Sequence, residues 1–352
     1  MSIERLELKN FRCFTHASFE FQYPIVLIQG HNGTGKTTLL EALFYLSTLR
    51  SFRTHIPRDL IAFEKDSFFI QAHVDQHRLT IGSTGTKKLV KIDEKTVESY
   101  QELRSLLRIV ILTENELEIV SGGPEQRRMF LDHALALHSA TYITVAKRYK
   151  QALEQRNALF YRSSFYSQEE FEIWTENVWK LSCELVLARS AYLADLTKVM
   201  TDHLPTALQG ISCIYQARYI VLTETFQDFF TKMAPVFAKE RYYKRSLFGA
   251  HLDDMAITLN NKPARLFSSR GQQKYIVALL KLAQAQHLVH TTGPVTLIFD
   301  DFATDLDSKF LGAIIEHARM SAHQLIFTSP LQDGPEKQYF DRHAIEYQIL
   351  SI

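Results

Sequence analysis

Apolar and polar residues alternate near the start of the chain, and the pattern then changes to a continuous apolar run. The alternation over 3–8 and 19–21 predicts two short strands joined by a turn near 10–14. The run at 25–28, Ile-Val-Leu-Ile, is typical of a strand buried on both faces of a sheet. Leucines at helical spacing then predict a helix over 37–49.

Further strand-like segments lie in both outer parts of the chain. In the N-terminal part, strands are predicted at 68–74, 78–83, 87–92 and 108–112. The C-terminal third predicts a helix, a buried strand, a helix and two closing strands, at 272–289, 295–299, 309–320, 324–328 and 344–350. This alternation at both ends favours one α/β lobe assembled from the two ends of the chain.

The middle of the chain has a different pattern. Residues 125–200 contain little glycine or proline, and their apolar residues recur at helical spacing, which predicts two or three helices with a break near 163–167. A strand at 211–221 and a helix at 224–240 follow. We therefore expect an α/β lobe formed by 1–124 and 246–352, interrupted by an inserted, mainly helical domain at 125–245.

The composition is that of an ordinary soluble protein, with 46% hydrophobic and 22% charged residues. Forty basic and thirty-nine acidic residues give a net charge of +1, so any contact with nucleic acid requires a local basic patch. The three cysteines are far apart and form neither a zinc site nor a disulfide framework. Without a signal peptide or a long apolar run, we expect a cytoplasmic protein with no membrane partner.

Residues 30–37 read Gly-His-Asn-Gly-Thr-Gly-Lys-Thr and match the phosphate-binding pattern G-x-x-x-x-G-K-[ST]. In such a loop, backbone N–H groups and the N-terminus of the following helix hold phosphate oxygens. Lys36 would supply a positive charge to the β- and γ-phosphates, and the Thr37 hydroxyl would ligate Mg²⁺. The predicted nucleotide-binding residues are Gly30, His31, Asn32, Gly33, Thr34, Gly35, Lys36, Thr37 and Thr38.

Acidic residues at the end of a buried strand supply the second element that such a site needs. Asp300 and Asp301 directly follow the predicted strand at 295–299. We expect Asp300 to hold Mg²⁺, directly or through water, and Asp301 to orient or deprotonate the attacking water. The sequence thus predicts ATP and Mg²⁺ as cofactors, and Lys36, Asp300 and Asp301 as the catalytic residues.

The run Ser269-Arg270-Gly271-Gln272 leads into the predicted helix at 272–289 and resembles the S-x-G-Q signature of ABC-type ATPases. Alone, it would read as an ordinary helix cap. The order of motifs favours the signature, because Asp305-Leu306-Asp307 follows the acidic strand end as a D-loop. The resemblance implies a P-loop ABC-type ATPase head that dimerises with ATP between two subunits. It assigns nucleotide contacts to Ser269, Gly271, Gln272 and Asp307.

A second set of motifs lies partly outside the nucleotide site. It comprises Ser-Phe-Arg-Thr at 51–54, Gly-Gly-Pro-x-x-Arg-Arg-x-Phe-Leu-Asp at 122–132, His251 with Asp253-Asp254, Ser269–Lys274, and Asp-Asp-Phe-Ala-Thr-Asp-Leu-Asp at 300–307. By these motifs the chain resembles the RecF family of bacterial DNA-repair ATPases over essentially its full length.

The resemblance implies a weak, DNA-stimulated ATPase that dimerises on duplex, single-stranded or gapped DNA. It implies a RecR-like mediator as partner, with RecO and RecA acting indirectly, and a role in RecA loading at gaps, replication-fork maintenance, recombination and the SOS response. The expected location is the bacterial cytoplasm, in association with the nucleoid.

Four positions depart from related proteins. Ala250 and Leu252 stand where RecF proteins usually have proline and arginine, and Ser329 stands where ABC transporters place a switch histidine. Asp301 is also one methylene shorter than the glutamate common at its position. The last two differences predict slow turnover, as in a nucleotide-timed clamp rather than a motor.

Basic residues gather in two stretches that also contain aromatic residues, an arrangement that suits phosphate contact and base stacking. Without the RecF resemblance, these stretches would read as solvated helix faces. With it, they become the predicted DNA contacts: Lys147, Arg148, Arg241, Lys244 and Arg245.

Two other functions stay open on the sequence alone. An ATPase subunit of a transporter usually has Asp-Glu where this chain has Asp300-Asp301, and it has a switch histidine. It also lacks a helical insertion in the middle of the chain. An ATPase of a defence nuclease complex often carries a fused nuclease domain, for which this chain leaves no room.

Overall fold

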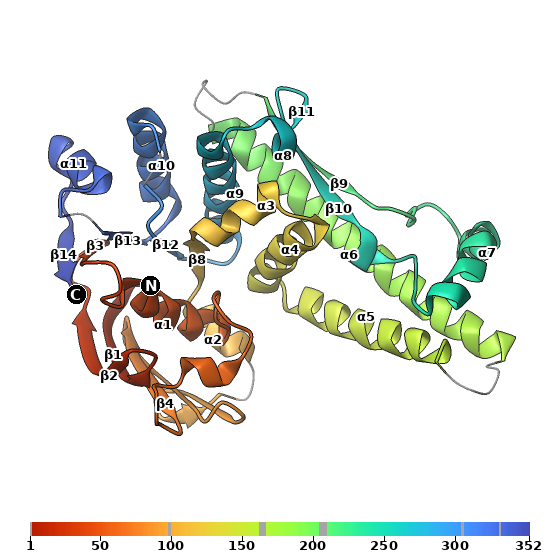
Figure 1. The fold of residues 1–352 in the computed structure, drawn as a ribbon, viewed down its shortest axis with the longest axis horizontal. Coiled ribbons are helices and arrows are strands. Elements are labelled where there is room, and N and C mark those ends of the chain that lie inside the picture. The colour runs from red at the N-terminus through yellow and green to blue at the C-terminus, as the bar shows by residue number, and fades with distance from the viewer. Residues whose placement is uncertain (1, 98–99, 162–166, 204–209, 304–305, 331) are drawn as a thin grey trace. The chain divides into compact units, whose positions relative to one another are not determined.

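The computed structural model describes residues 2–97, 100–161, 167–203, 210–303, 306–330 and 332–352 (Figure 1). The chain divides into two compact units. The head unit consists of residues 1–117 and 269–352, and the inserted unit consists of residues 118–268.

The inserted unit is longer at both ends than the predicted 125–245. At its C-terminal side, β10 (Asp254–Leu259) pairs with β9 (Ile211–Gln216) in a sheet that the sequence pattern did not reveal. At its N-terminal side, α3 (Glu118–Ser121) packs against α8 (Ala264–Phe267). Both pairings keep residues outside 125–245 within the inserted unit.

The head unit begins with an antiparallel sheet in the order β2-β1-β4-β5-β6-β7. Its strands are β1 (Ile3–Phe11), β2 (Phe14–Glu20), β4 (Phe68–Val74), β5 (His77–Ser83), β6 (Lys88–Ile92) and β7 (Lys95–Thr96). The predicted alternation is confirmed, because Ile3, Leu6 and Leu8 on β1 are buried while the residues between them are more exposed.

The second sheet of the head unit is parallel, in the order β14-β3-β13-β12-β8. Its strands are β3 (Ile25–Gln29), β8 (Ile109–Leu112), β12 (Thr296–Phe299), β13 (Gln324–Ser329) and β14 (Gln348–Ser351). Strands from both ends of the chain therefore form one sheet, which confirms the predicted α/β head built from the two termini. Strands β3 and β12 are buried along their whole length, as a parallel strand covered on both faces should be.

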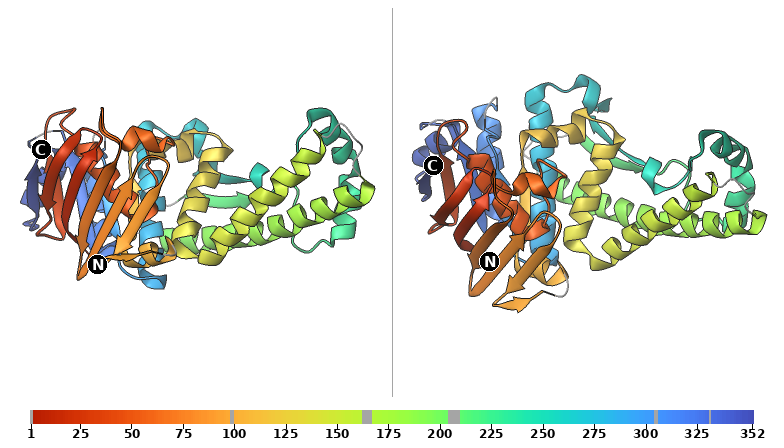
Figure 2. Two further views of the ribbon diagram at one scale, coloured as in Figure 1. Left: turned by 90° about the horizontal axis from the view of Figure 1, so that it is seen from below. Right: turned by 60° about the horizontal axis from the view of Figure 1, so that its bottom comes forward.

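Helices lie on both faces of the parallel sheet (Figures 1 and 2). Helix α1 (Lys36–Thr48) lies on one face, and its leucines share a core with residues of both sheets. Helices α9 (Arg270–Thr291), α10 (Ser308–Ser321) and α11 (Pro335–Arg342) lie on the other face. The predicted helices at 37–49, 272–289 and 309–320 are confirmed within a few residues. Helices α2 (Tyr100–Leu106) and α11 were not predicted, because both are short.

The inserted unit contains α4 (Pro124–His138), α5 (Ala140–Leu159), α6 (Gln168–His203) and α7 (Phe226–Tyr243), with a small sheet in the order β11-β10-β9, where β11 is Lys262–Pro263. Helix α5 packs along α6. The predicted break at 163–167 falls largely on residues outside the described part of the chain. Two predicted strands are shorter than expected: β9 ends at Gln216 rather than near 221, and β14 begins at Gln348 rather than 344.

The arginines of the 122–132 motif bind the aspartates of the 253–254 motif within the inserted unit. Arg127 donates two hydrogen bonds to the Asp254 carboxylate, at 2.7 and 3.0 Å. Arg128 donates to the backbone oxygen of Asp253 at 2.7 Å. These two motifs are therefore one ion-paired contact between α4 and the start of β10.

A fully buried ion pair joins three helices of the inserted unit. The Arg156 guanidinium on α5 donates to Glu240 on α7 at 2.6 Å and to Thr175 on α6 at 3.0 Å. Arg156 and Glu240 are both 0% exposed. The guanidinium also lies over the rings of Phe171 and Phe248, at 4.8 and 4.7 Å from their centroids.

In the described part of the chain, no helix is both long enough and apolar enough to cross a bilayer.

Candidate functional site

The loop at 30–35 connects β3 to α1 and depends on glycine at its two ends. Gly35 has a φ of +110°, and a Cβ placed there would lie 2.7 Å from the Phe14 ring. A Cβ on Gly30 would lie 2.4 Å from the backbone oxygen of Ile352. The loop therefore follows this path only with glycine at both positions, and it leads directly into the N-terminus of α1.

The Lys36 side chain lies inside this loop. Its Nζ donates to the backbone oxygens of Gly30 at 2.6 Å and His31 at 2.9 Å, and the residue is 8% exposed. Thr34 Oγ1 donates to the same His31 oxygen at 3.0 Å. The cation is thus placed next to the concave backbone of the loop, where an anion would replace the carbonyl oxygens as its partner.

The phosphate-binding loop and the acidic strand end meet at Thr37 and Asp300, which are 263 positions apart in the sequence. Thr37 Oγ1 donates to Asp300 Oδ1 at 3.3 Å. Thr328 Oγ1 donates to the same carboxylate oxygen at 3.0 Å and accepts from the Asp301 N–H at 2.8 Å. Strands β12 and β13 run parallel in register, so both acidic residues stand at the carboxyl edge of the sheet beside the loop.

The Asp300 carboxyl is largely withdrawn from water. Burial raises its pKa, and the hydroxyls of Thr328 and Thr37 partly counteract that shift. A cation next to the carboxylate would offset the cost of burial. A hydroxyl and a carboxylate at this distance, beside a phosphate-binding loop, fit Mg²⁺, which keeps water and phosphate oxygens as its other ligands. In the described residues, this site included, no group of three or more His, Cys, Asp or Glu side chains is arranged to hold a metal by itself.

The predicted signature caps helix α9 at its N-terminus. Ser269 accepts from the Gln272 N–H, and the Gln272 side chain accepts from the Ser269 N–H at 2.8 Å, which is a complete capping box. Gly271 lies in the same first turn. Ser269 is exposed, and among the described residues neither Ser269 nor Gln272 bonds to the loop at 30–37. The capping role considered from the sequence is therefore present, and it leaves the serine accessible from outside.

The structure describes the remaining predicted nucleotide contacts, but not all of the predicted D-loop. Asp307 caps α10 by accepting from the Lys309 N–H at 2.8 Å. Asp305, the other acid of the predicted D-loop, lies outside the described residues. His31 and Asn32 are exposed at the tip of the loop, whereas Thr38 is buried in the first turn of α1.

All five predicted DNA contacts lie on the surface of the inserted unit. Lys147 and Arg148 are exposed on α5, and Arg241 is exposed in the last turn of α7. Lys244 ends α7 in a left-handed conformation, and its Nζ lies 5.7 Å from the centroid of the Tyr161 ring. Arg245 follows it.

One charged residue near the site belongs to a motif found in the sequence, but sequence analysis gave it no role. Arg53 belongs to the Ser-Phe-Arg-Thr run, and its charge acts on Asp300 to lower the carboxyl pKa. The buried Glu41 carboxylate holds Arg53 at 3.5 Å and also accepts from Arg12 at 2.7 Å. The motif therefore places a positive charge near the predicted metal ligand.

Glu336 is a second residue that sequence analysis missed. It lies in the first turn of α11, is 3% exposed, and has the carboxylate of Asp301 as a charged neighbour. Burial above all, with a contribution from the Asp301 charge, raises its pKa to about 7. No pattern pointed to this residue, because the short helix that carries it was not predicted.

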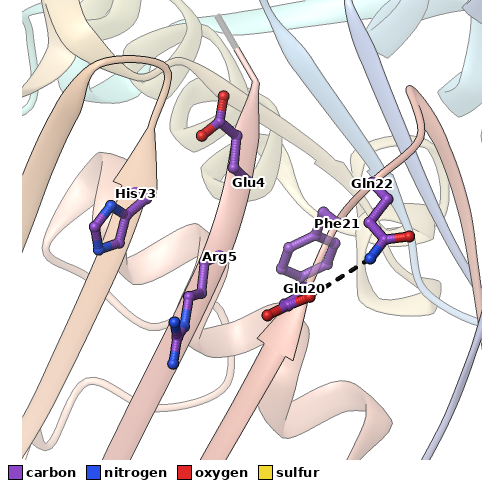
Figure 3. A pocket seen from close by; sticks show the side chains of 6 residues that line it. All are labelled: Glu4, Arg5, Glu20, Phe21, Gln22 and His73. Atoms are coloured by element: carbon purple, nitrogen blue, oxygen red, sulfur yellow. Dashed lines mark hydrogen bonds between the residues drawn. The ribbon is translucent and has the colours of Figure 1, made fainter.

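A pocket also occurs in the head unit (Figure 3). It is lined by Glu4, Arg5, Glu20, Phe21, Gln22 and His73. None of these residues belongs to the predicted nucleotide-binding set, so the pocket is separate from the site at Thr37 and Asp300.

Comparison with known proteins decides the family. Residues 2–337 match the family model described as RecF/RecN/SMC N terminal domain. The chain belongs to this family. The resemblance to RecF inferred from the motifs is thereby confirmed.

Curated relatives cover almost the whole chain. DNA replication and repair protein RecF of Geotalea daltonii is 28% identical over 342 residues, which is 94% of this chain and 93% of that protein. The protein of the same name from Histophilus somni is 27% identical over 357 residues, or 99% and 98% of the two chains. A solved structure of the recombination mediator protein RecF-ATP in the RecFOR pathway has a TM-score of 0.84 at 24% identity, with 94% and 92% of the chains covered. That likeness confirms the fold of this chain.

Proposed function

We propose that this family member is an ATP-dependent DNA-binding protein of DNA replication and recombinational repair. The observation that carries the proposal is the contact between Thr37 and Asp300 at the phosphate loop, since it assembles a nucleotide site from both ends of the chain. The relatives named as DNA replication and repair proteins favour this function over a transporter or a defence nuclease complex. The serine at 329, where transporters have histidine, agrees with that choice.

The cofactors of the site are ATP and Mg²⁺. Lys36 and the backbone N–H groups of the loop bind the phosphates, and Thr37 and Asp300 hold the metal ion. When bound, Mg²⁺ neutralises charge on the terminal phosphates. Asp301 orients the attacking water and accepts its proton. Because Asp301 is short and Ser329 replaces the histidine, hydrolysis is slow, and the nucleotide times a clamp. By the resemblance to RecF, DNA stimulates this hydrolysis.

The site is completed by a second copy of the chain. Ser269 is exposed and Gly271 and Gln272 are partly exposed at the N-terminus of α9, and such a terminus is suited to an anion. In the dimer it meets the γ-phosphate held by the partner's loop, and Asp307 contributes from the D-loop. ATP therefore joins the two heads, and hydrolysis separates them.

Replacement of Ser269 by arginine is expected to abolish the ATP-dependent dimer, because a long cationic side chain at the exposed cap blocks the approach of the second head. Light scattering with ATP should give the dimer mass for the wild-type protein and the monomer mass for S269R. Arg270→Lys, a conservative change at the next exposed position, is the matched control and should still dimerise. An ATP-dependent dimer of S269R would refute the shared site.

Contacts to DNA come from exposed basic residues of the inserted unit, Lys147, Arg148, Arg241, Lys244 and Arg245. Two strongly exposed aromatic residues, Tyr242 and Tyr243, lie between Arg241 and Lys244 and are 82% and 56% exposed. Cations supply contacts to phosphates, and exposed rings offer surfaces for base stacking.

Charge reversal at Arg241, Lys244 and Arg245 is expected to weaken DNA binding and to flatten its dependence on salt, by about one unit of slope for each phosphate that the protein no longer neutralises. Binding to gapped DNA would be titrated at several salt concentrations, with and without ATP. Reversal of three exposed lysines of the head unit, Lys65, Lys87 and Lys95, serves as the control. Equal salt slopes for the two triple variants would argue against this surface.

We infer the protein partners from the resemblance to RecF, which the relatives of that name support. A RecR-like mediator binds the DNA-bound dimer, and RecO and RecA act with it indirectly. The complex supports RecA loading at gaps, maintenance of replication forks and the SOS response, in the bacterial cytoplasm at the nucleoid.

A further inference from the structure

A buried carboxyl lies next to the hydrolytic side of the nucleotide site and has no role in the proposed hydrolysis so far. Glu336 is 3% exposed, and in the described residues its Oε2 has no hydrogen-bond partner. Its carboxyl interacts with the Ser329 hydroxyl and with the backbone of Ala303, two residues beyond Asp301. Burying a carboxyl is costly, so its position between these segments calls for a reason beyond packing.

The geometry at Gly334 shows how closely the groups approach. A Cβ on Gly334 would lie 2.3 Å from Ser329 Oγ and 2.9 Å from Glu336 Oε2, so both oxygens lie against the bare α-carbon. The loop that contains Gly334 also borders the start of the phosphate loop, because the Gln29 side chain donates to the backbone oxygen of Gln332 at 2.8 Å. Glu336 is therefore held beside the end of β13, at the position where a switch histidine would act.

Among the charged groups around α11, Asp301 is the one whose negative charge raises the pKa of Glu336. Lys337 pairs with Asp333 at 2.7 Å, on the exposed side of the helix. Helix α10 meets α11 through Tyr339, which donates to Glu316 at 3.1 Å. The negative charge of Asp301, by contrast, acts directly on the Glu336 carboxyl.

We propose that Glu336 is a positioning residue for ATP hydrolysis, and that its neutral form supports Ser329 and Asp301 without adding a second negative charge beside the terminal phosphate. The inference rests on the proposed ATPase function. In the step itself, the water oxygen bonds to the γ-phosphorus, and the bond to the β–γ bridging oxygen breaks with its electron pair going to ADP. One water proton passes to Asp301. Glu336 takes no part in the bond changes, but it keeps Asp301 charged and able to accept that proton.

The raised pKa agrees with this role. A carboxyl that titrates at about 7 is neutral below that pH and charged above it. Its ionisation would put two carboxylates side by side next to the phosphates of ATP, where like charges repel. Hydrolysis should therefore slow as the pH rises through about 7.

The test is the pH profile of phosphate release at saturating ATP, measured for wild type, Glu336→Gln and Glu316→Gln. We expect the wild-type rate to fall about tenfold between pH 6 and pH 8, as one neutral carboxyl is lost. Glu336→Gln, which stays neutral, should match the wild type within about twofold at pH 6 and lose this fall. Glu316→Gln, which alters a carboxyl of α10 that contacts α11, should keep the wild-type profile.

Two outcomes overturn the inference while leaving the ATPase function intact: a Glu336→Gln profile that falls like the wild type, or a folded Glu336→Gln protein that is inactive at every pH. Wild-type protein that releases no phosphate at any pH would refute the proposed function as well. Gly334→Ala is a second variant, since its methyl group would push Ser329 away from Glu336; it should lower the rate severalfold at pH 6, and an unchanged rate would also overturn the inference.

Discussion

Lys36→Ala should lower the rate of ATP hydrolysis by roughly 10²–10³-fold, the usual loss when one preorganised donor is removed from a transition state. The amine of Lys36 is 8% exposed and lies within hydrogen-bond distance of two backbone oxygens of the loop. In the proposed function, this amine would lie where charge develops on the β–γ bridging oxygen. An alanine leaves the phosphate oxygens without this cation, and the loop sequence contains no other lysine or arginine to replace it.

Steady-state phosphate release at saturating ATP measures this effect, and thermal unfolding shows whether the variant is folded. Lys65→Ala is the control, because Lys65 is an exposed lysine of the same unit. A folded Lys36→Ala protein that keeps more than about a third of the wild-type rate would contradict the role of this lysine.

Arg156→Met should destabilise the inserted unit by about 3–5 kcal/mol, the cost of leaving one member of a buried ion pair without its partner. Glu240 accepts from Arg156 at 2.6 Å, and both side chains are 0% exposed, so the remaining carboxylate cannot reach water. The loss includes the interactions of the guanidinium with the surrounding phenylalanine rings.

The double variant Arg156→Met, Glu240→Leu should recover most of that loss, because it removes both charges and keeps apolar volume. Urea unfolding followed by tryptophan fluorescence suits the measurement, since both tryptophans of the chain, Trp174 and Trp179, lie on α6 of the inserted unit. A double variant as unstable as Arg156→Met would show that the shape of the arginine, and not its charge, stabilises the unit.

The parts of the fold and site that could be predicted have contiguous sequence signals. The loop at 30–37 carries its own motif between a buried strand and a helix, so its place in the fold followed directly. Strand β12 is an apolar run followed by two aspartates, and this change from apolar to acidic residues located Asp300. Both signals involve neighbours in sequence.

The missed features depend on contacts between distant residues. Strand β10 is short and begins at an aspartate, and it is a strand because β9 pairs with it. Helix α11 has eight residues, of which only Glu336 and Phe340 are buried, so it lacks an apolar stripe that periodicity could detect. Arg156 resembles any helical arginine, and its complete burial arises from residues on three other segments. Tertiary packing sets such environments, and the local sequence does not record them.

The central claim is that each nucleotide site is shared by two copies of the chain, with the loop from one and Ser269 from the other. Mixing Lys36→Ala with Ser269→Ala tests it most directly, because Ser269→Ala removes the hydroxyl without adding a side chain that blocks the second head, and each variant alone is expected to hydrolyse ATP slowly. In a mixed dimer, one site carries both defects and the other carries none, so one intact site is regained. Random mixing makes half of the dimers mixed, and we predict about a quarter of the wild-type rate of ATP hydrolysis. A mixture no more active than either variant alone would contradict the shared site.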